Sequence, residues 1–465
     1  MNYDEFLKSK AERAIPSGHV ADINDLNRDA FEWQKYITRW AVAKGKCALF
    51  EDCGLGKTLQ QLDWAQQVHK HTGGDVLILA PLAVSRQTIG EGVKFGIPVN
   101  LCETQADAKP GINVTNYEKL HHFEPSAFAG IALDESSILK HVSSKTRQIL
   151  TESFVDTPYR LACTATPAPN DYMELGNHSE FLGVMTRSEM LSTFFVHDGG
   201  DTQSWRLKGH AESKFWEWVA SWAVVLQNPA DLGFSPDGFD LPPLDIQEHI
   251  AIAGRLENAD GQMMLLPQSN QTMNDRRAAR RNSITERVAK AAEIANNTDA
   301  QVLVWCDMNN ESAALAKSIN GAVEVTGSHP DEYKTAAMTG FAKGGIRVLV
   351  SKPSIAGWGM NWQNCHNMIF VGLSDSFEAY YQAVRRCWRY GQSQQVNVHI
   401  ITSEAEGAVS DNIKRKQEAA RRMSGYMVQH TKEILSDEIR NTHRLSEKYY
   451  ASEPIRLPGF LESAS

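Results

Sequence analysis

Residues 47–60 read CALFEDCGLGKTLQ, and this stretch decides how the rest of the chain is interpreted. The apolar run Cys47–Phe50 predicts a buried strand, and the residues from Lys57 to Gly74 predict an amphipathic helix. The glycine-rich turn between them allows backbone N–H groups to converge on phosphate oxygens at the positive end of the helix. The full phosphate-loop pattern has a glycine at the position of Glu51, so this chain matches only its GLGKT part. The prediction is therefore strand, phosphate loop and helix, and the alternative is an ordinary loop before a helix.

Each residue of this loop has a predicted task in nucleotide binding. Gly54, Leu55 and Gly56 would surround the phosphates with backbone N–H groups. Lys57 would reach the β- and γ-phosphates, and the hydroxyl of Thr58 would hold Mg²⁺. The predicted cofactors are therefore ATP and Mg²⁺.

The composition is that of an ordinary globular protein. The 465 residues are enough for two or three domains, and 42% are hydrophobic and 22% charged. A net charge of −9 argues against a protein that coats nucleic acid over its whole surface, but it leaves room for a local basic track. The seven cysteines form no Cys-x-x-Cys pair, so neither a zinc site nor a disulfide framework is indicated.

The first residues, MNYDEFLKSKAERAIPSG, are too charged for a signal peptide. No apolar run approaches the roughly 18 residues that a membrane-spanning helix needs. Both observations predict a cytoplasmic protein with no membrane partner.

Short β-rich runs alternate with helical patterns in the first half of the chain. The predicted strands are residues 75–81, 98–102, 112–117, 130–135 and 159–167. This alternation predicts an α/β fold with a parallel sheet and crossover helices. Ligands of such sheets bind at the carboxyl ends of the strands, which is where polar residues stand in this chain.

The run IALDESS places two carboxylates at the end of one of these strands. Asp134 is predicted to bind Mg²⁺ through water, and Glu135 to polarise the attacking water. The alternative is an acidic cap at the start of a helix. After the next strand, Thr164 and Thr166 could link the nucleotide site to a bound polymer, or they form only a turn before Pro167.

An aromatic helix precedes the phosphate loop, with the sequence AFEWQKYITRWAV at residues 30–42. Its apolar residues recur at helical spacing and are expected to face a core. Gln34 interrupts them, and its amide has the donor and the acceptor that the Watson–Crick edge of adenine requires. Gln34 and the neighbouring Trp33 are therefore assigned to the nucleotide site, although a solvated glutamine is the alternative.

The strand–helix alternation is lost between about residues 171 and 281. Residues 171–240 are rich in tryptophan at helical spacing, which predicts a helical protrusion whose aromatic residues form a core rather than a base-stacking surface. Residues 251–281 are assigned to a connector or second protrusion. The basic run NDRRAARRNS, residues 274–283, is either a solvated face or a phosphate contact.

A second alternating unit occupies residues 282–430, without a phosphate loop of its own. Its predicted strands are residues 301–306, 322–327, 346–351, 367–372 and 396–401, and residues 431–465 are expected to be a tail. Within QAVRRCWRYGQ, Arg386 and Arg389 would project from one face of a helix and stabilise the γ-phosphate across the cleft. The alternative is a basic helix that lies on nucleic acid.

In this order, the segments resemble those of superfamily 2 helicase-like ATPases, and among them the SWI/SNF-type double-stranded DNA translocases. DCGLGKTLQ is similar to that family's aspartate-glutamate-methionine-GLGKT loop, and DESS stands where the family has aspartate-glutamate-alanine/glycine-histidine. AGWGMNW, residues 356–362, resembles GGLGINL. QAVRRCWRYGQ resembles QAIGRAHRIGQ, with Gln382, Arg386, Arg389, Gly391 and Gln392 in common. Ser137, in place of the family's histidine, is a departure.

The resemblance implies two RecA-like parallel-sheet lobes with a helical region between them. The first lobe would be residues 1–250 with the protrusion at 171–240, and the second would carry the arginine fingers. Gly359 and Gln382 are assigned to the nucleotide site by the same resemblance. The implied function is an ATP-dependent motor on double-stranded DNA; the alternatives are a strand-separating DNA or RNA helicase and a slow ATP-switched binding module. The short chain suggests a bacterial or phage protein, a monomer in the cytoplasm of a bacterial cell or of a phage-infected host.

Overall fold

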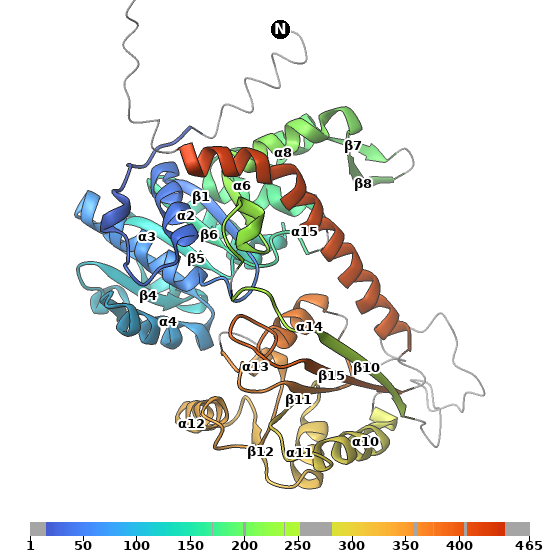
Figure 1. Cartoon of the computed structure of the whole chain (residues 1–465). Helices are drawn as coiled ribbons and strands as arrows, with labels where there is room; N and C mark the ends of the chain where they lie inside the picture. The colour runs from blue at the N-terminus through green and yellow to red at the C-terminus, as the bar shows by residue number, and fades with distance from the viewer. Residues whose placement is uncertain are drawn as a thin grey trace, which may run out of the picture.

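The structure, a computed structural model, forms two α/β lobes joined by a long C-terminal helix (Figure 1). It describes residues 15–169, 171–198, 201–236, 238–251, 281–356, 360–374, 376–403 and 407–441. Each lobe is built on a parallel sheet, which confirms the predicted fold class of two RecA-like lobes. Among the described residues, no helix has both the length and the apolar character that crossing a membrane requires.

The first lobe contains a seven-stranded parallel sheet in the order β3-β4-β2-β5-β6-β1-β9. Its strands are β1 (Lys46–Glu51), β2 (Asp75–Ala80), β3 (Val99–Leu101), β4 (Ile112–Asn116), β5 (Phe128–Asp134), β6 (Tyr159–Cys163) and β9 (Ala223–Leu226). Its larger helices are α2 (Glu32–Lys44), α3 (Lys57–Thr72), α4 (Leu82–Phe95) and α5 (Lys145–Ser153). Leu49 packs into the core under α2 and α3, and its neighbour Phe50 packs into the core on the opposite face. This alternation along β1 is why the sheet is covered on both sides.

The region predicted as a helical protrusion is only partly helical. It contains α6 (Leu175–Leu182), α7 (Arg187–Phe194) and α8 (Glu212–Ala220), but also the antiparallel pair β7 (Phe195–Asp198) and β8 (Asp201–Leu207). The run AVVL then returns to the first sheet as β9, beside β1. Trp216, Trp218 and Trp222 are fully buried, which confirms that these aromatic residues form a core.

The second lobe contains a six-stranded parallel sheet in the order β10-β15-β14-β11-β13-β12. Its strands are β10 (Leu244–Ala251), β11 (Val302–Cys306), β12 (Ala322–Val325), β13 (Val348–Ser351), β14 (Asn367–Val371) and β15 (Val396–Ser403). Its helices are α10 (Ile284–Asn296), α11 (Asn309–Ser318), α12 (Asp331–Ala342), α13 (Pro353–Ala356) and α14 (Phe377–Val384). β10 pairs with β15 along its whole length, although its residues fall almost entirely within the range assigned to the first lobe. Of the basic run at 274–283, the structure describes residues 281–283 only.

Helix α15 (Gly407–Asn441) runs from the second lobe to the first (Figure 1). At the second lobe, Lys414 forms an ion pair of 2.7 Å with Glu248 of β10. At the first lobe, Leu435 and Ile439 are fully buried in the core that includes α2 and α3. The tail predicted from residue 431 is therefore helical as far as Asn441, and its apolar residues dock the helix on the first lobe.

Replacing Leu435 with alanine is expected to weaken this docking. A buried leucine-to-alanine change removes packing and leaves a cavity, so the free energy of unfolding should fall by about 2–4 kcal/mol. Urea denaturation of the full chain would measure the loss. Glu433→Ala is the matched control because Glu433 is exposed on the same helix. Equal unfolding midpoints for the two variants would contradict the proposed docking.

Candidate nucleotide site between the lobes

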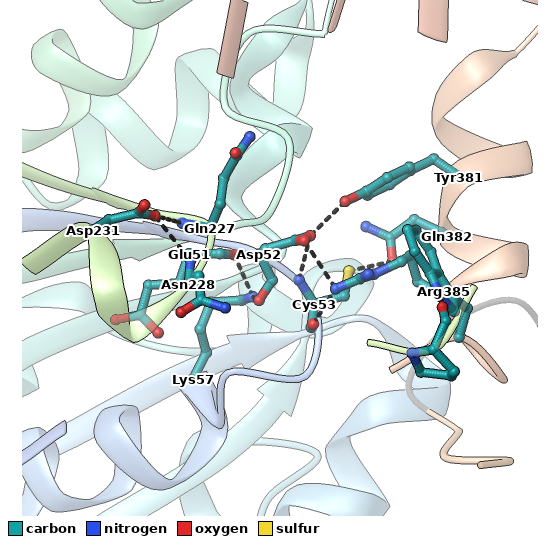
Figure 2. A network of polar contacts seen from close by, with 12 residues as sticks. Glu51, Asp52, Cys53, Lys57, Gln227, Asn228, Asp231, Tyr381, Gln382 and Arg385 are labelled. Carbon is teal, nitrogen blue, oxygen red and sulfur yellow. Dashed lines mark hydrogen bonds and ion pairs between the residues drawn. The ribbon is translucent and has the colours of Figure 1, made fainter. Parts of the chain in front are cut away.

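The phosphate loop joins β1 to α3 and closes around its own lysine. Gly54 and Gly56 have φ angles of 90° and 77°, in the left-handed region that favours glycine. A Cβ at Gly56 would lie 2.4 Å from Nε2 of Gln34, so a side chain there would displace the amide of that glutamine. Lys57 opens α3, and its ammonium donates to the carbonyl oxygens of Glu51 at 2.7 Å and Asp52 at 3.0 Å (Figure 2).

The remaining predicted residues of the loop lie beside the lysine. Leu55 is buried in the core of the first lobe. Thr58 is half-buried in the first turn of α3, next to Lys57. The loop thus presents glycine backbone, an ammonium and a hydroxyl at the start of one helix, as phosphate and Mg²⁺ binding requires.

Gln34 is bound to the loop rather than exposed. Its Nε2 donates to the carbonyl oxygen of Leu55 at 2.8 Å, and its Oε1 accepts from the backbone N–H of Phe31 at 2.9 Å. Both ends of the amide are thus used inside the protein, and reading adenine would require it to exchange these partners. Trp33 is 3% exposed and meets Phe239 edge to face, with ring centroids 5.5 Å apart. The assignment of both residues to the nucleotide site stays a prediction.

The two carboxylates lie at the carboxyl end of β5, as the strand pattern predicts. Asp134 ends the strand, and its Oδ1 accepts from Nε2 of Gln61 at 2.8 Å. Its backbone oxygen accepts from the hydroxyl of Tyr117 at 2.7 Å. Glu135 has a φ angle of 55°, a conformation that costs energy for a residue with a side chain. Its Oε2 is buried and has no partner among the described residues.

Burial makes these carboxyl groups easier to protonate. It raises the pKa of Glu135 to about 7, with the nearby charge of Asp134 acting in the same direction. Burial also raises the pKa of Asp134, and that of Glu51 to about 7. A cation at this edge of the sheet would favour the charged forms. Thr58 and Asp134 supply oxygen ligands of the kind that Mg²⁺ prefers, and the unpartnered Oε2 of Glu135 leaves an acceptor free, so these residues fit the ion.

The arginines of the second lobe follow α14 rather than lie on it. The helix ends at Val384, so the predicted helical face of Arg386 and Arg389 is wrong. Beyond the helix end, the carbonyl oxygen of Arg386 accepts from the N–H of Trp362 at 2.9 Å. The Arg386 side chain turns back and donates to both the backbone oxygen and Oε1 of Gln382, at 3.0 and 2.8 Å.

The positive charge of Arg389 is poorly compensated by the groups around it. Burial and the adjacent charge of Arg386 lower the pKa of Arg389 to about 10. Its Nε is buried and has no partner among the described residues. Burial likewise lowers the pKa of Arg386. Two guanidinium groups are thus held close together in a partly dry site, an arrangement that an anion would relieve.

The predicted residues of the two lobes approach one another at the phosphate loop, and groups from both lobes act on the pKa of Glu135. Lys57 from the first lobe and Arg386 from the second both act to lower the pKa of Glu135, against the larger effect of burial. A Cβ placed on Gly54 would lie 3.4 Å from Cβ of Arg389. Gln382 also faces the loop, because Sγ of Cys53 lies 3.7 Å from its Oε1. Gly359 lies outside the described residues.

Several contacts between the lobes were not predicted. Arg385 pairs with Asp52 of the phosphate loop at 2.9 Å, and the hydroxyl of Tyr381 donates to the same carboxylate (Figure 2). Glu378 of α14 forms an ion pair with Lys140 and accepts from the hydroxyl of Thr166 at 3.5 Å. One signal in the sequence could have pointed to Arg385, which stands where QAIGRAHRIGQ has a glycine.

Part of the second lobe is similar to a known protein family, and the chain as a whole is similar to solved structures. No curated protein matches the chain. Among solved structures, the SWI2/SNF2 ATPase core of Sulfolobus solfataricus, determined in complex with double-stranded DNA, is similar. The match covers 90% of this chain and 99% of that chain, with 17% sequence identity and a TM-score of 0.41. Residues 285–391 match the family model of the helicase conserved C-terminal domain.

Proposed function

We propose that the chain hydrolyses ATP between its lobes and uses the reaction to move along double-stranded DNA. The observation that carries the ATPase proposal is the contact of both lobes at the phosphate loop, where Arg385 pairs with Asp52 at 2.9 Å and a Cβ placed on Gly54 would lie 3.4 Å from Cβ of Arg389. Lys57 of the first lobe and Arg386 of the second both act electrostatically on Glu135. A site completed from two lobes allows hydrolysis to be coupled to their closure.

The roles of the residues follow from their positions. Gly54, Gly56 and Lys57 would bind the phosphates, and Glu135 would orient the water that attacks the γ-phosphorus. Arg386 and Arg389 would stabilise the charge that develops on the phosphoryl group. Thr58 and Asp134 would hold Mg²⁺, which supplies charge neutralisation on the phosphate oxygens when it is bound.

ATP turnover is expected to rise with pH through neutrality. Glu135 can accept a hydrogen bond from water at both oxygens only when it is ionised, and burial places its pKa at about 7. The ratio kcat/KM, whose pH dependence reports the free enzyme, should therefore increase from about pH 6 to about pH 8 and then level off. Glu51→Gln is the control, because burial also raises the pKa of Glu51 to about 7. Loss of the pH dependence in that variant would reassign the titration to Glu51.

The DNA part of the proposal rests on the family match and on the motif resemblance. Residues 285–391 match the family model of the helicase conserved C-terminal domain, and the order of motifs resembles that of double-stranded DNA translocases. Both halves of the proposed site come from one chain, so we expect a monomer to be sufficient. The cytoplasmic location and the bacterial or phage origin stay predictions.

The test is a comparison of ATP turnover with duplex DNA, single-stranded DNA and RNA, beside a triplex-displacement assay on the same duplex. The proposal expects the greatest stimulation by duplex DNA together with displacement of the third strand. Stimulation by single strands alone would favour a strand-separating helicase, and duplex stimulation without displacement would favour an ATP-switched binding module. Raising the salt concentration should weaken stimulation steeply, because contacts to phosphates release counterions.

A further inference from the structure

Asp52, the residue that follows β1, is bound from three directions. Its backbone N–H donates to the carbonyl oxygen of Leu226 in β9 at 2.8 Å, which fixes it to the sheet of the first lobe. Its Oδ1 accepts from the N–H of Cys53 at 2.7 Å and from the hydroxyl of Tyr381. Its Oδ2 accepts from Nη2 of Arg385 at 2.9 Å (Figure 2). A single loop carboxylate therefore receives two donors from the second lobe.

The guanidinium of Arg385 is committed to this contact. The side chain is 3% exposed, and the same Nη2 also donates to the carbonyl oxygen of Cys53. Burial, the largest single effect, acts to lower the pKa of Arg385, but Asp52, Tyr381 and Cys53 together outweigh it and hold that pKa above its ordinary value. The ring of Trp388 lies 5.1 Å from the guanidinium carbon and restricts its orientation further. Nη2 of Arg385 is thus bound to the loop, while its Nε is buried without a partner among the described residues.

The contact also bears on the proposed catalytic groups. The carbonyl oxygen of Asp52 accepts from Lys57 at 3.0 Å, so one residue meets the lysine through its backbone and the second lobe through its side chain. The next residue after Arg385 is Arg386, and Arg389 approaches the loop at Gly54. A shift of the second lobe on this contact would move both arginines relative to Lys57.

We infer that Arg385, assisted by Tyr381, is a positioning residue that docks the second lobe on the phosphate loop through Asp52 and thereby places Arg386 and Arg389. The inference rests on the proposed ATPase function. Its consequence is kinetic, because a misplacement of about 1 Å in a reacting group can lower a rate about 10²-fold.

The first test is the kinetics of Arg385→Ala in the full chain. We expect kcat for ATP to fall about 10–100-fold with KM changed by less than about threefold, since a displaced arginine affects the transition state more than nucleotide binding. Arg385→Lys should retain part of the rate, because lysine keeps the positive charge but lacks the planar, two-pronged guanidinium group. Arg421→Ala is the matched control, an exposed arginine on α15. Exchanging the charges in Asp52→Arg/Arg385→Asp should restore part of the rate lost in either single variant.

The second test needs no ATP turnover. Hydrogen–deuterium exchange at residues 52–56 should become faster in Arg385→Ala, while exchange in the strands of both sheets stays unchanged and shows that the fold is kept. Unchanged exchange at the loop, an unchanged kcat, or a kcat above that of the wild type would each overturn the inference. A rise in KM as large as the fall in kcat would make Arg385 a nucleotide-binding residue instead. If the wild type hydrolyses no ATP with any nucleic acid, the proposed function fails, and the positioning role fails with it.

Discussion

Replacing Lys57 with alanine is expected to remove nucleotide binding and ATP turnover together. Its ammonium lies at the first turn of α3 and is held by the carbonyl oxygens of Glu51 and Asp52. These are bonds that an arriving phosphate oxygen can replace, because an anion is a stronger acceptor for an ammonium than a neutral carbonyl group. Removing one preorganised donor of this kind lowers kcat by about 10²–10³-fold. We expect at least this loss, with a parallel loss of affinity in a fluorescent-nucleotide titration.

The control for this variant is Lys70→Ala, which removes an exposed lysine from the same helix. It should leave both affinity and turnover unchanged. Because Lys57 also bonds to the backbone of the loop, thermal unfolding of the two variants should be compared to exclude a general loss of structure. Nucleotide affinity equal to that of the wild type in Lys57→Ala would contradict the phosphate-loop assignment.

The sequence predicts the parts of the fold that depend on local periodicity. The apolar run that becomes β1, the glycines of the loop and the start of α3 all lie within residues 47–60, so one stretch is sufficient for their prediction. The strand β9 was missed, because AVVL completes the edge of a sheet whose neighbouring strand, β1, lies far away in the sequence. The docking of α15 was missed for the same reason. Leu435 and Ile439 are two apolar residues in a polar segment, and only the first lobe explains their burial.

The candidate site likewise contains residues that the local sequence predicts and contacts that it does not. Asp134 and Glu135 could be predicted because the carboxyl end of a parallel strand is where ligands bind. The partners of Asp52 could not, since Arg385 and Asp52 are separated by 333 positions and their pairing depends on how the lobes meet. The motif match also gave no warning that α14 would end at Val384. A helical pattern of charges gives the spacing of the arginines, but not the residue at which the helix ends.

The electrostatics of the site indicate that it is arranged for an anion and a cation together. On one side, burial raises the pKa of Glu135 to about 7. On the other, burial and Arg386 lower the pKa of Arg389 to about 10. Each group is therefore held in surroundings that disfavour its charge. Such arrangements are typical of functional sites, where a bound substrate supplies the missing counter-charge.

Arg389→Ala is expected to abolish turnover while ATP binding stays nearly intact. An arginine that acts across the cleft stabilises charge that develops only during phosphoryl transfer, so its loss should lower kcat by about 10³–10⁵-fold. The same change should not destabilise the protein without nucleotide, because it removes a buried charge whose Nε has no partner among the described residues.

Two measurements separate this prediction from a structural role. Thermal unfolding without nucleotide should show a midpoint equal to or above that of the wild type, and nucleotide titration should show an affinity within about threefold of it. Arg389→Lys should recover little of the rate, because an ammonium lacks the planar fork that spans two phosphate oxygens. An equal loss of ATP binding and turnover would count against the finger assignment, since a group that acts only in the transition state leaves the ground-state complex unchanged.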